Sequence, residues 1–281
     1  MKGSERTTAL VDIVIRGKNG HEKTERAIRS IRENTKPEWY RIVLVDDGSD
    51  PAYFETLPDV GDLLVAYPDS AGAVTATNRG FAIALDLDAP FVMVMDNDAW
   101  IPDGDATWLT RFVEEILEDE RIGAVGATTG RANPPQHILT TPDTYSADWK
   151  ADDGRSGGTN TNPAVASLVS FACLIRKDVL RQVDGGRWDT RYDPGNYEDT
   201  DFAVTIRTLG YSVRVARSVY LHHDGHATFG PGVHAIVAKN RKRFTEKWGV
   251  GRLVDLGIIK PGEFAEACAK ASSSTVIGAT R

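Results

Sequence analysis

The sequence of 281 residues contains only two cysteines and no long apolar run, and each absence excludes a class of protein. Cys173 and Cys268 lie far apart and no Cys-x-x-Cys pair occurs, so neither a disulfide framework nor a cysteine zinc site is expected. No window approaches the length of a membrane-spanning helix, and the apolar run near the start is too short for the core of a signal peptide. We therefore expect a soluble, cytoplasmic protein.

Positive charges are also outnumbered by negative ones. Lys and Arg together number 33 against 40 Asp and Glu, which gives a formal net charge of −7. A protein that binds nucleic acid needs a basic surface to neutralise phosphates, so no nucleic-acid partner is expected. The content of hydrophobic residues, 41%, is nevertheless typical of a globular domain with a sizeable core.

What the sequence does contain is an alternation of short apolar strands with amphipathic helices. Residues 10–15 and 40–45 are β-branched runs typical of strands, and residues 21–33 between them have apolar side chains at helical spacing. This order predicts a parallel strand pair with a right-handed crossover. Further strands are predicted at 62–67, 122–127, 165–176 and 211–216, and further helices at 73–85, 107–117, 177–183, 202–209 and 233–248. The predicted fold class is α/β, a single domain with a mostly parallel central sheet and helices on both faces.

The stretch from Phe91 to Trp100 carries the first chemical signal. Five apolar residues, typical of a strand buried on both faces, run into Asp96, Asn97 and Asp98. Because side chains alternate along a strand, Asp96 and Asp98 are expected to project the same way. Two carboxylates at the carboxyl edge of a sheet suit Mg²⁺ or Mn²⁺ holding phosphates. A turn that merely ends the strand is the simpler interpretation of an isolated Asp-x-Asp, so the neighbouring motifs decide.

Other candidates follow strands predicted to end at the same edge. Asp46 and Asp47 come directly after 40–45, where they either form a turn and helix cap or accept hydrogen bonds from a nucleoside. Arg79 either pairs with a diphosphate or, more simply, with a carboxylate. Gly80 beside it costs a helix about 1 kcal/mol relative to Ala, which indicates close packing or a ligand approaching the backbone.

Three acids, Glu198, Asp199 and Asp201, occupy the predicted first turn of the helix at 202–209. Acids in that position interact favourably with the helix dipole, which is a complete structural explanation. They follow a loop rich in glycine and aromatic residues, however, and could equally supply a general base.

Histidines 222, 223 and 226 are crowded into five residues after the strand 211–216. Three imidazoles so close together suggest a metal ligand or a phosphate contact, although for each one alone a surface role is the simpler interpretation. The helix at 233–248 has apolar residues on one side and a basic cluster on the other. A solvated basic face is expected there, and contact with an anionic membrane surface is the alternative.

In this order and spacing the motifs resemble family 2 glycosyltransferases of the GT-A fold, with rhamnosyltransferase-like members closest. The resemblance runs from about residue 12 to residue 248 and rests on VDDGSD, SAGAVTATNRG, VMVMDNDAW, FACLIRKDVL, GGRWDTRYDPGNYEDTDFAVTIRTLGYSV and SVYLHHDGHATF. It implies a nucleotide-sugar donor, a divalent cation (Mn²⁺ or Mg²⁺) and transfer to an acceptor hydroxyl with inversion, by direct displacement with a carboxylate base. It also implies a glycosyltransferase domain at 8–250, with a donor half at 8–127 and an acceptor and catalytic half at 128–230. Residues 231–281 would then form a C-terminal helix and tail.

The resemblance also implies a role for individual positions. The implied donor contacts are Asp46, Asp47, Asn78, Arg79, Asp96 and Asn97, the implied metal ligands are Asp98 and His222, and the implied base is Asp199, with Glu198 beside it. Secondary candidates are Asp201, His223, His226 and Trp188. Two departures weaken the donor contacts, because Arg16-Gly-Lys-Asn19 replaces the family's Pro-Thr-Tyr-Asn-like turn and Ser70 stands where Asn is more usual.

Other function classes account for the sequence less well. A sugar-phosphate nucleotidyltransferase would need a glycine-rich basic loop after the first strand, and an NAD-dependent enzyme would need G-x-G-x-x-G there. A non-catalytic nucleotide-sugar-binding protein would keep Asp98 without needing Asp199. The sugar, the nucleotide base and the acceptor, whether glycan, lipid carrier or small molecule, are set by loop shape and do not follow from these motifs.

Overall fold

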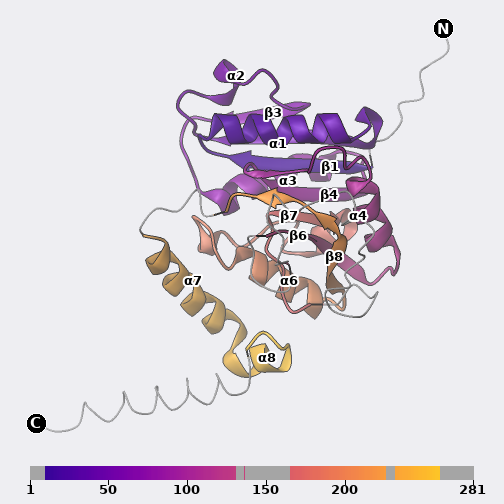
Figure 1. Cartoon of the computed structure of the whole chain (residues 1–281). Coiled ribbons are helices and arrows are strands. Elements are labelled where there is room, and N and C mark those ends of the chain that lie inside the picture. The colour runs from indigo at the N-terminus through magenta and orange to yellow at the C-terminus, as the bar shows by residue number, and fades with distance from the viewer. Residues whose placement is uncertain (1–9, 131–135, 137–164, 226–231, 260–281) are drawn as a thin grey trace, which may run out of the picture.

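A seven-stranded sheet runs through the centre of the molecule, with helices packed on both of its faces (Figure 1). The computed structural model describes residues 10–130, 136, 165–225 and 232–259. The strands, in spatial order across the sheet, are β3 (Leu63–Tyr67), β2 (Tyr40–Asp47), β1 (Val11–Gly17), β4 (Phe91–Asp96), β7 (Ala172–Arg176), β6 (Ile122–Thr128) and β8 (Ser212–Tyr220). All neighbouring strands are parallel except that β7 runs antiparallel to both β4 and β6. The predicted fold class is therefore confirmed.

The helices lie close to their predicted positions, and a second, two-stranded ribbon stands apart from the main sheet. The helices are α1 (His21–Asn34), α2 (Tyr53–Thr56), α3 (Ala73–Asp86), α4 (Trp108–Leu117), α5 (Lys177–Gln182), α6 (Glu198–Thr208), α7 (Val233–Trp248) and α8 (Val250–Asp255), with short 3-10 turns at Pro37–Trp39 and Thr190–Tyr192. The ribbon consists of β5 (Ala99–Trp100) and β9 (His222–His223). None of the helices within the described ranges is both long and apolar enough to span a bilayer.

The central strands β1, β2 and β4 are mostly apolar, and side chains on both of their faces are buried. In β1, Ile13 and Ile15 belong to the core beneath α1 and α4, whereas Val14 belongs to the core beneath α3, α5 and α6. This alternation follows from the period of two along a strand. Gly80 of α3 rests directly on Val14 and Val45, where a Cβ atom would collide with the Val14 side chain. Close packing of α3 on the sheet therefore explains why residue 80 is a glycine. This was one of the two predicted alternatives, the other being a ligand approaching the backbone.

The strand predicted from residue 165 begins only at Ala172. Before it, the side-chain amide of Gln136 is hydrogen-bonded to the backbone of Val169. Its Nε2 donates to the carbonyls of Ala127 and Val169, and its Oε1 accepts from the Val169 backbone N–H at 2.6 Å. Residues 137–164 lie outside the described residues.

The C-terminal helix α7 extends away from the sheet and contacts the body around Thr190–Tyr192 (Figure 1). Its predicted apolar face is only partly buried, because Phe244 and Asn240 are its only buried residues. Its basic cluster is not wholly solvated either, since Lys247 forms ion pairs with Asp189 and Asp201. Membrane contact through this helix stays the alternative to a solvated basic face.

Candidate active site

The carboxyl ends of β1, β2 and β4 meet at one edge of the sheet because the three strands are parallel. Arg16 of β1 lies opposite Asp96 of β4, and Gly17 lies opposite Asp46 of β2. The expected convergence of aspartates from different strands at this edge is therefore present in the fold.

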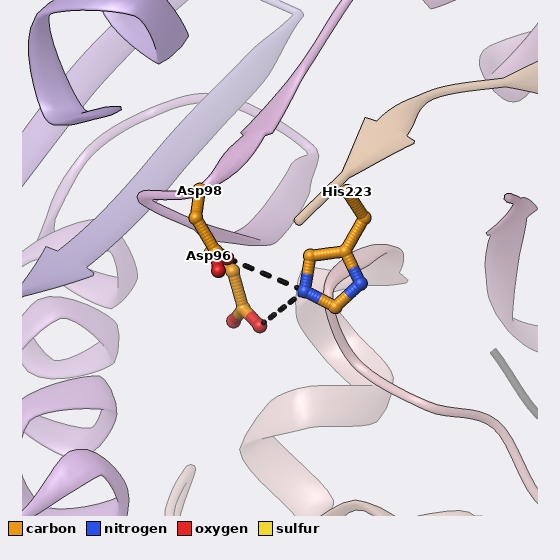
Figure 2. Close-up of side chains that lie close together, drawn as sticks. All are labelled: Asp96, Asp98 and His223. Carbon is orange, nitrogen blue, oxygen red and sulfur yellow. Dashed lines mark ion pairs between the residues drawn. The ribbon is translucent and has the colours of Figure 1, made fainter. Parts of the chain in front are cut away.

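A histidine reaches this edge through the ribbon of β5 and β9. The chain turns at Asn97 and Asp98 into β5, and Ala99 pairs antiparallel with His223. His223 Nε2 consequently lies 3.3 Å from an Asp98 carboxylate oxygen and 3.5 Å from one of Asp96 (Figure 2). The ligand atoms of the three side chains all lie within 4.8 Å of one another. Among the described residues, this is the cluster of carboxylate and imidazole groups with the spacing of a metal site.

Arg16 supplies a positive charge to the same cluster. Its Nη1 donates to Asp96 at 2.5 Å. Burial disfavours the charged form of Asp96, but the charges of Arg16 and His223 outweigh it and lower the pKa of Asp96 to about 2. Burial likewise opposes a charged His223, yet its hydrogen bonds to Asp96 and Asp98 raise its pKa to about 9. In the sequence, Arg16 stands out only because it departs from the family's usual first turn, and the sequence predicts no role for it.

Glu198 and Asp199 open α6, as predicted. The two residues before them, Asn196 and Tyr197, adopt the left-handed conformation with φ of 73° and 77°, which non-glycine residues rarely occupy. Glu198 is buried, and its Oε2 has no hydrogen-bond partner. Burial and the neighbouring charge of Asp199 raise the pKa of Glu198 to about 8, and the charges of Arg16 and Asp96 also reach it. The acid pair therefore lies within electrostatic range of the metal-type cluster.

The third acid of that turn has a different role. Asp201 is buried and accepts hydrogen bonds from Tyr192 Oη, Trp248 Nε1 and Lys247 Nζ, at 3.1, 2.7 and 2.7 Å. These partners tie α6 to the end of α7. The carboxylate of Asp201 is therefore occupied by partners within the protein, and a direct role for it in the site stays a prediction.

The two aspartates that end β2 are occupied by their own chain. Asp46 accepts the backbone N–H groups of Ser49 and Tyr53, as a turn residue does, which is one of the two predicted alternatives. Asp47 accepts from the Ser70 hydroxyl, from the backbone N–H groups of the two following residues and from Arg79 Nη1 at 3.0 Å. Both carboxylates shape the loops along the edge of the sheet.

The remaining predicted donor contacts also have partners within the protein. The Asn78 amide forms two hydrogen bonds with the backbone of Trp188, at 2.7 and 2.9 Å. Trp188 itself is buried against Phe81 and Phe202. Asn97 points away from the carboxylates and donates to the Thr24 hydroxyl. Direct donor contacts by these residues stay predictions.

The structure brings His223, rather than the predicted His222, to the carboxylates. Neighbouring residues in a strand face opposite ways, and His222 instead stacks on Trp100 with ring centroids 4.9 Å apart. Sequence alone could not distinguish the two histidines, because the choice depends on the register of a two-residue strand. His226 lies outside the described residues.

A mostly parallel sheet of this strand order is the arrangement of the GT-A fold, which the two solved structures described below share. Residues 12–184 match the family described as glycosyl transferase family 2, and the chain belongs to this family.

Two solved structures share the fold. One is the mannosyltransferase PcManGT from Pyrobaculum calidifontis in complex with GDP-Man and Mn²⁺, with TM-score 0.60 and 17% identity, over 98% of this chain and 76% of that one. The other is GalNAc-T7 with UDP, GalNAc and Mn²⁺, with TM-score 0.61 and 17% identity, over 86% of this chain and 49% of that one, about half its length. No curated protein sequence matches the chain. The predicted family and fold are confirmed, and the likeness to rhamnosyltransferases stays a prediction.

Proposed function

We propose that the protein is a metal-dependent, inverting glycosyltransferase that moves a sugar from a nucleotide-sugar donor to an acceptor hydroxyl. The observation that carries this proposal is the convergence of Asp96, Asp98 and His223 at the sheet edge, within electrostatic range of the acid pair Glu198 and Asp199. The complexes of the two solved neighbours with Mn²⁺ and a nucleotide support it.

The residues present fit a divalent cation. Two carboxylate oxygens and one imidazole nitrogen within 4.8 Å form a ligand set that suits Mn²⁺, whereas Mg²⁺ prefers oxygen ligands alone. Asp98 and His223 would hold the ion with Asp96, whose other oxygen is fixed by Arg16. When bound, such an ion would neutralise the negative charge that develops on the diphosphate leaving group.

Asp199 is the base in this proposal. Of the two adjacent acids, Glu198 has a buried oxygen without a partner, which favours its protonated form. Asp199 instead accepts the Thr200 backbone N–H at 2.6 Å, which favours its charged form. Partial burial raises the pKa of Asp199 and so brings it nearer to the working pH of a base. The ionised Asp199 would take the proton from the acceptor hydroxyl as the sugar is transferred.

The first half of the chain would bind the donor mainly through the shape of its loops. Asp47 organises residues 70–72, and Asn78 fixes the backbone at Trp188. Arg79, stacked 3.5 Å above the Tyr67 ring, extends this framework. The acceptor would enter from the half that contains α6.

The substitution Asp199→Asn tests the proposal. It keeps the shape of the side chain but removes the base, so sugar transfer should fall roughly 10²–10⁴-fold. The affinity for the nucleoside diphosphate with Mn²⁺ should stay unchanged, because the metal ligands lie on other elements. Transfer is measured with UDP-, GDP-, dTDP- and CDP-sugars, and binding by calorimetry on the same protein. A variant that transfers sugar at the wild-type rate would refute the role of Asp199.

A further inference from the structure

Asn240 is a fully buried amide in the middle of α7, a helix whose surface is otherwise mostly exposed. A buried polar side chain costs stability unless it is fully hydrogen-bonded, so an apolar residue would be the ordinary choice here. Asn240 is bonded thoroughly. Its Nδ2 lies 2.7 Å from the carbonyl of Tyr192, 2.9 Å from that of Gly195 and 3.1 Å from that of Asn196.

These three carbonyls belong to the loop that leads into the acid pair. The loop ends with Asn196 and Tyr197, both in the left-handed conformation, and Glu198 follows at once. Non-glycine residues keep such a conformation only where the surroundings enforce it, and this kind of strain gathers at functional sites. The orientation of Glu198 and Asp199 therefore depends on what holds this loop.

The loop is held from two sides. On the side of α3, Asp193 accepts the backbone N–H of Val74 at 3.0 Å and the Thr75 hydroxyl at 2.6 Å. On the other side, Asn240 bonds the loop carbonyls and Phe244, one turn further along α7, packs against the Tyr197 ring at 5.4 Å. The contacts of Asp193 with α3 precede the two residues in the left-handed conformation. The contacts of α7 reach those two residues themselves, Asn196 and Tyr197.

We infer that Asn240 is a positioning residue for the base Asp199, acting through the backbone of residues 192–197. This inference rests on the proposed function. It makes α7, which lies beyond the matched family segment 12–184, part of the catalytic half of the protein.

The test uses Asn240→Ala, and Asn240→Ser as a milder variant that keeps one donor. The matched control is Asn34→Ala, because Asn34 is also a buried helical amide bonded to a carbonyl, that of Ser30 in α1. Asn240→Ala should lower kcat by about 10- to 100-fold, as a misplaced reacting group does, with a smaller loss for Asn240→Ser. The KM for the donor and the Mn²⁺-dependent affinity for its nucleoside diphosphate should stay unchanged, and Asn34→Ala should keep its kcat.

A double variant separates positioning from general destabilisation. If Asn240 acts through Asp199, adding Asn240→Ala to Asp199→Asn should cause no further loss of kcat, because the base is already absent. Additive losses, or a wild-type kcat for both Asn240 variants, would overturn the inference. A different result would refute the proposed function: an Asp199→Asn variant that transfers sugar at the wild-type rate, whatever the Asn240 variants do. Intact nucleotide binding shows that each variant is folded.

Discussion

At the scale of single residues, the neighbouring acids Glu198 and Asp199 show how surroundings divide two similar side chains between roles. Glu198 is buried with one oxygen lacking a partner, whereas Asp199 is half-buried and accepts a backbone N–H. Burial and the charge of Asp199 raise the pKa of Glu198 from its ordinary 4.5 to about 8. A carboxyl group in such a position opposes folding once it must ionise, so ionised Glu198 does not stabilise the protein.

This pKa shift predicts how stability depends on pH. Between pH 4.5 and 8 the folded protein keeps the Glu198 proton that the unfolded chain releases, so the free energy of unfolding should decline as pH rises through this window. Glu198→Gln should remove that part of the decline and be more stable than wild type at pH 8. Urea unfolding at several pH values measures it, with Glu114→Gln on the exposed side of α4 as the control. If the free energies of unfolding of wild type and Glu198→Gln changed in parallel with pH across this range, the raised pKa of Glu198 would be contradicted.

At the scale of elements, the sequence predicts helices and strands well because the apolar period directly reflects the buried face. The helix predicted at 73–85 is α3 (Ala73–Asp86), and the one at 233–248 is α7 with the same bounds. Failures occur where a side chain replaces a backbone partner, as Gln136 does beside Val169. A hydrogen bond from a side chain in place of a backbone partner does not recur at a fixed spacing, so no pattern in the sequence predicts it.

Side-chain partners within the elements are far less predictable. Asp46 and Asp47 stand at the sheet edge, as expected, but their oxygens serve backbone N–H groups and Arg79 rather than standing free. The motif predicts the position of these residues, because a strand must end there. It does not predict the contacts, because loops folded back from elsewhere in the chain decide them.

Gly80 provides a prediction at this scale. Alanine favours a helix by about 1 kcal/mol over glycine, but at Gly80 its Cβ would collide with Val14, and overpacking a core costs typically ~1–3 kcal/mol. Gly80→Ala should therefore lower the free energy of unfolding. Gly251→Ala is the control, since Gly251 lies in α8 with open space around it and should gain about 0.4–1 kcal/mol. Urea unfolding of both variants decides, and a stabilised Gly80→Ala would show that α3 can move off the sheet.

At the scale of the whole molecule, the site is assembled from segments far apart in the sequence. Arg16 comes from β1, Asp96 and Asp98 from the end of β4, the acid pair from α6 and His223 from β9. Because β1 and β4 are parallel neighbours, their carboxyl ends meet at one edge, although the sequence predicts no role for Arg16. The histidine arrives through an antiparallel ribbon outside the main sheet, and the acid pair through a strained loop, so neither geometry follows from strand order alone.

In the proposed function, Asp98 and His223 bind a nucleoside diphosphate through a divalent cation, and calorimetric titration measures this binding. UDP, GDP, dTDP and CDP are titrated into the wild-type protein with Mn²⁺ and with EDTA, and then into Asp98→Ala and His223→Ala, with His222→Ala as the matched control. We expect at least one nucleotide to bind wild type only with Mn²⁺, and Asp98→Ala and His223→Ala to lose at least about 10-fold in affinity, as disrupted metal sites do. His222→Ala should bind like wild type. Equal binding with EDTA, or an Asp98→Ala variant that binds like wild type with Mn²⁺, would contradict the claim.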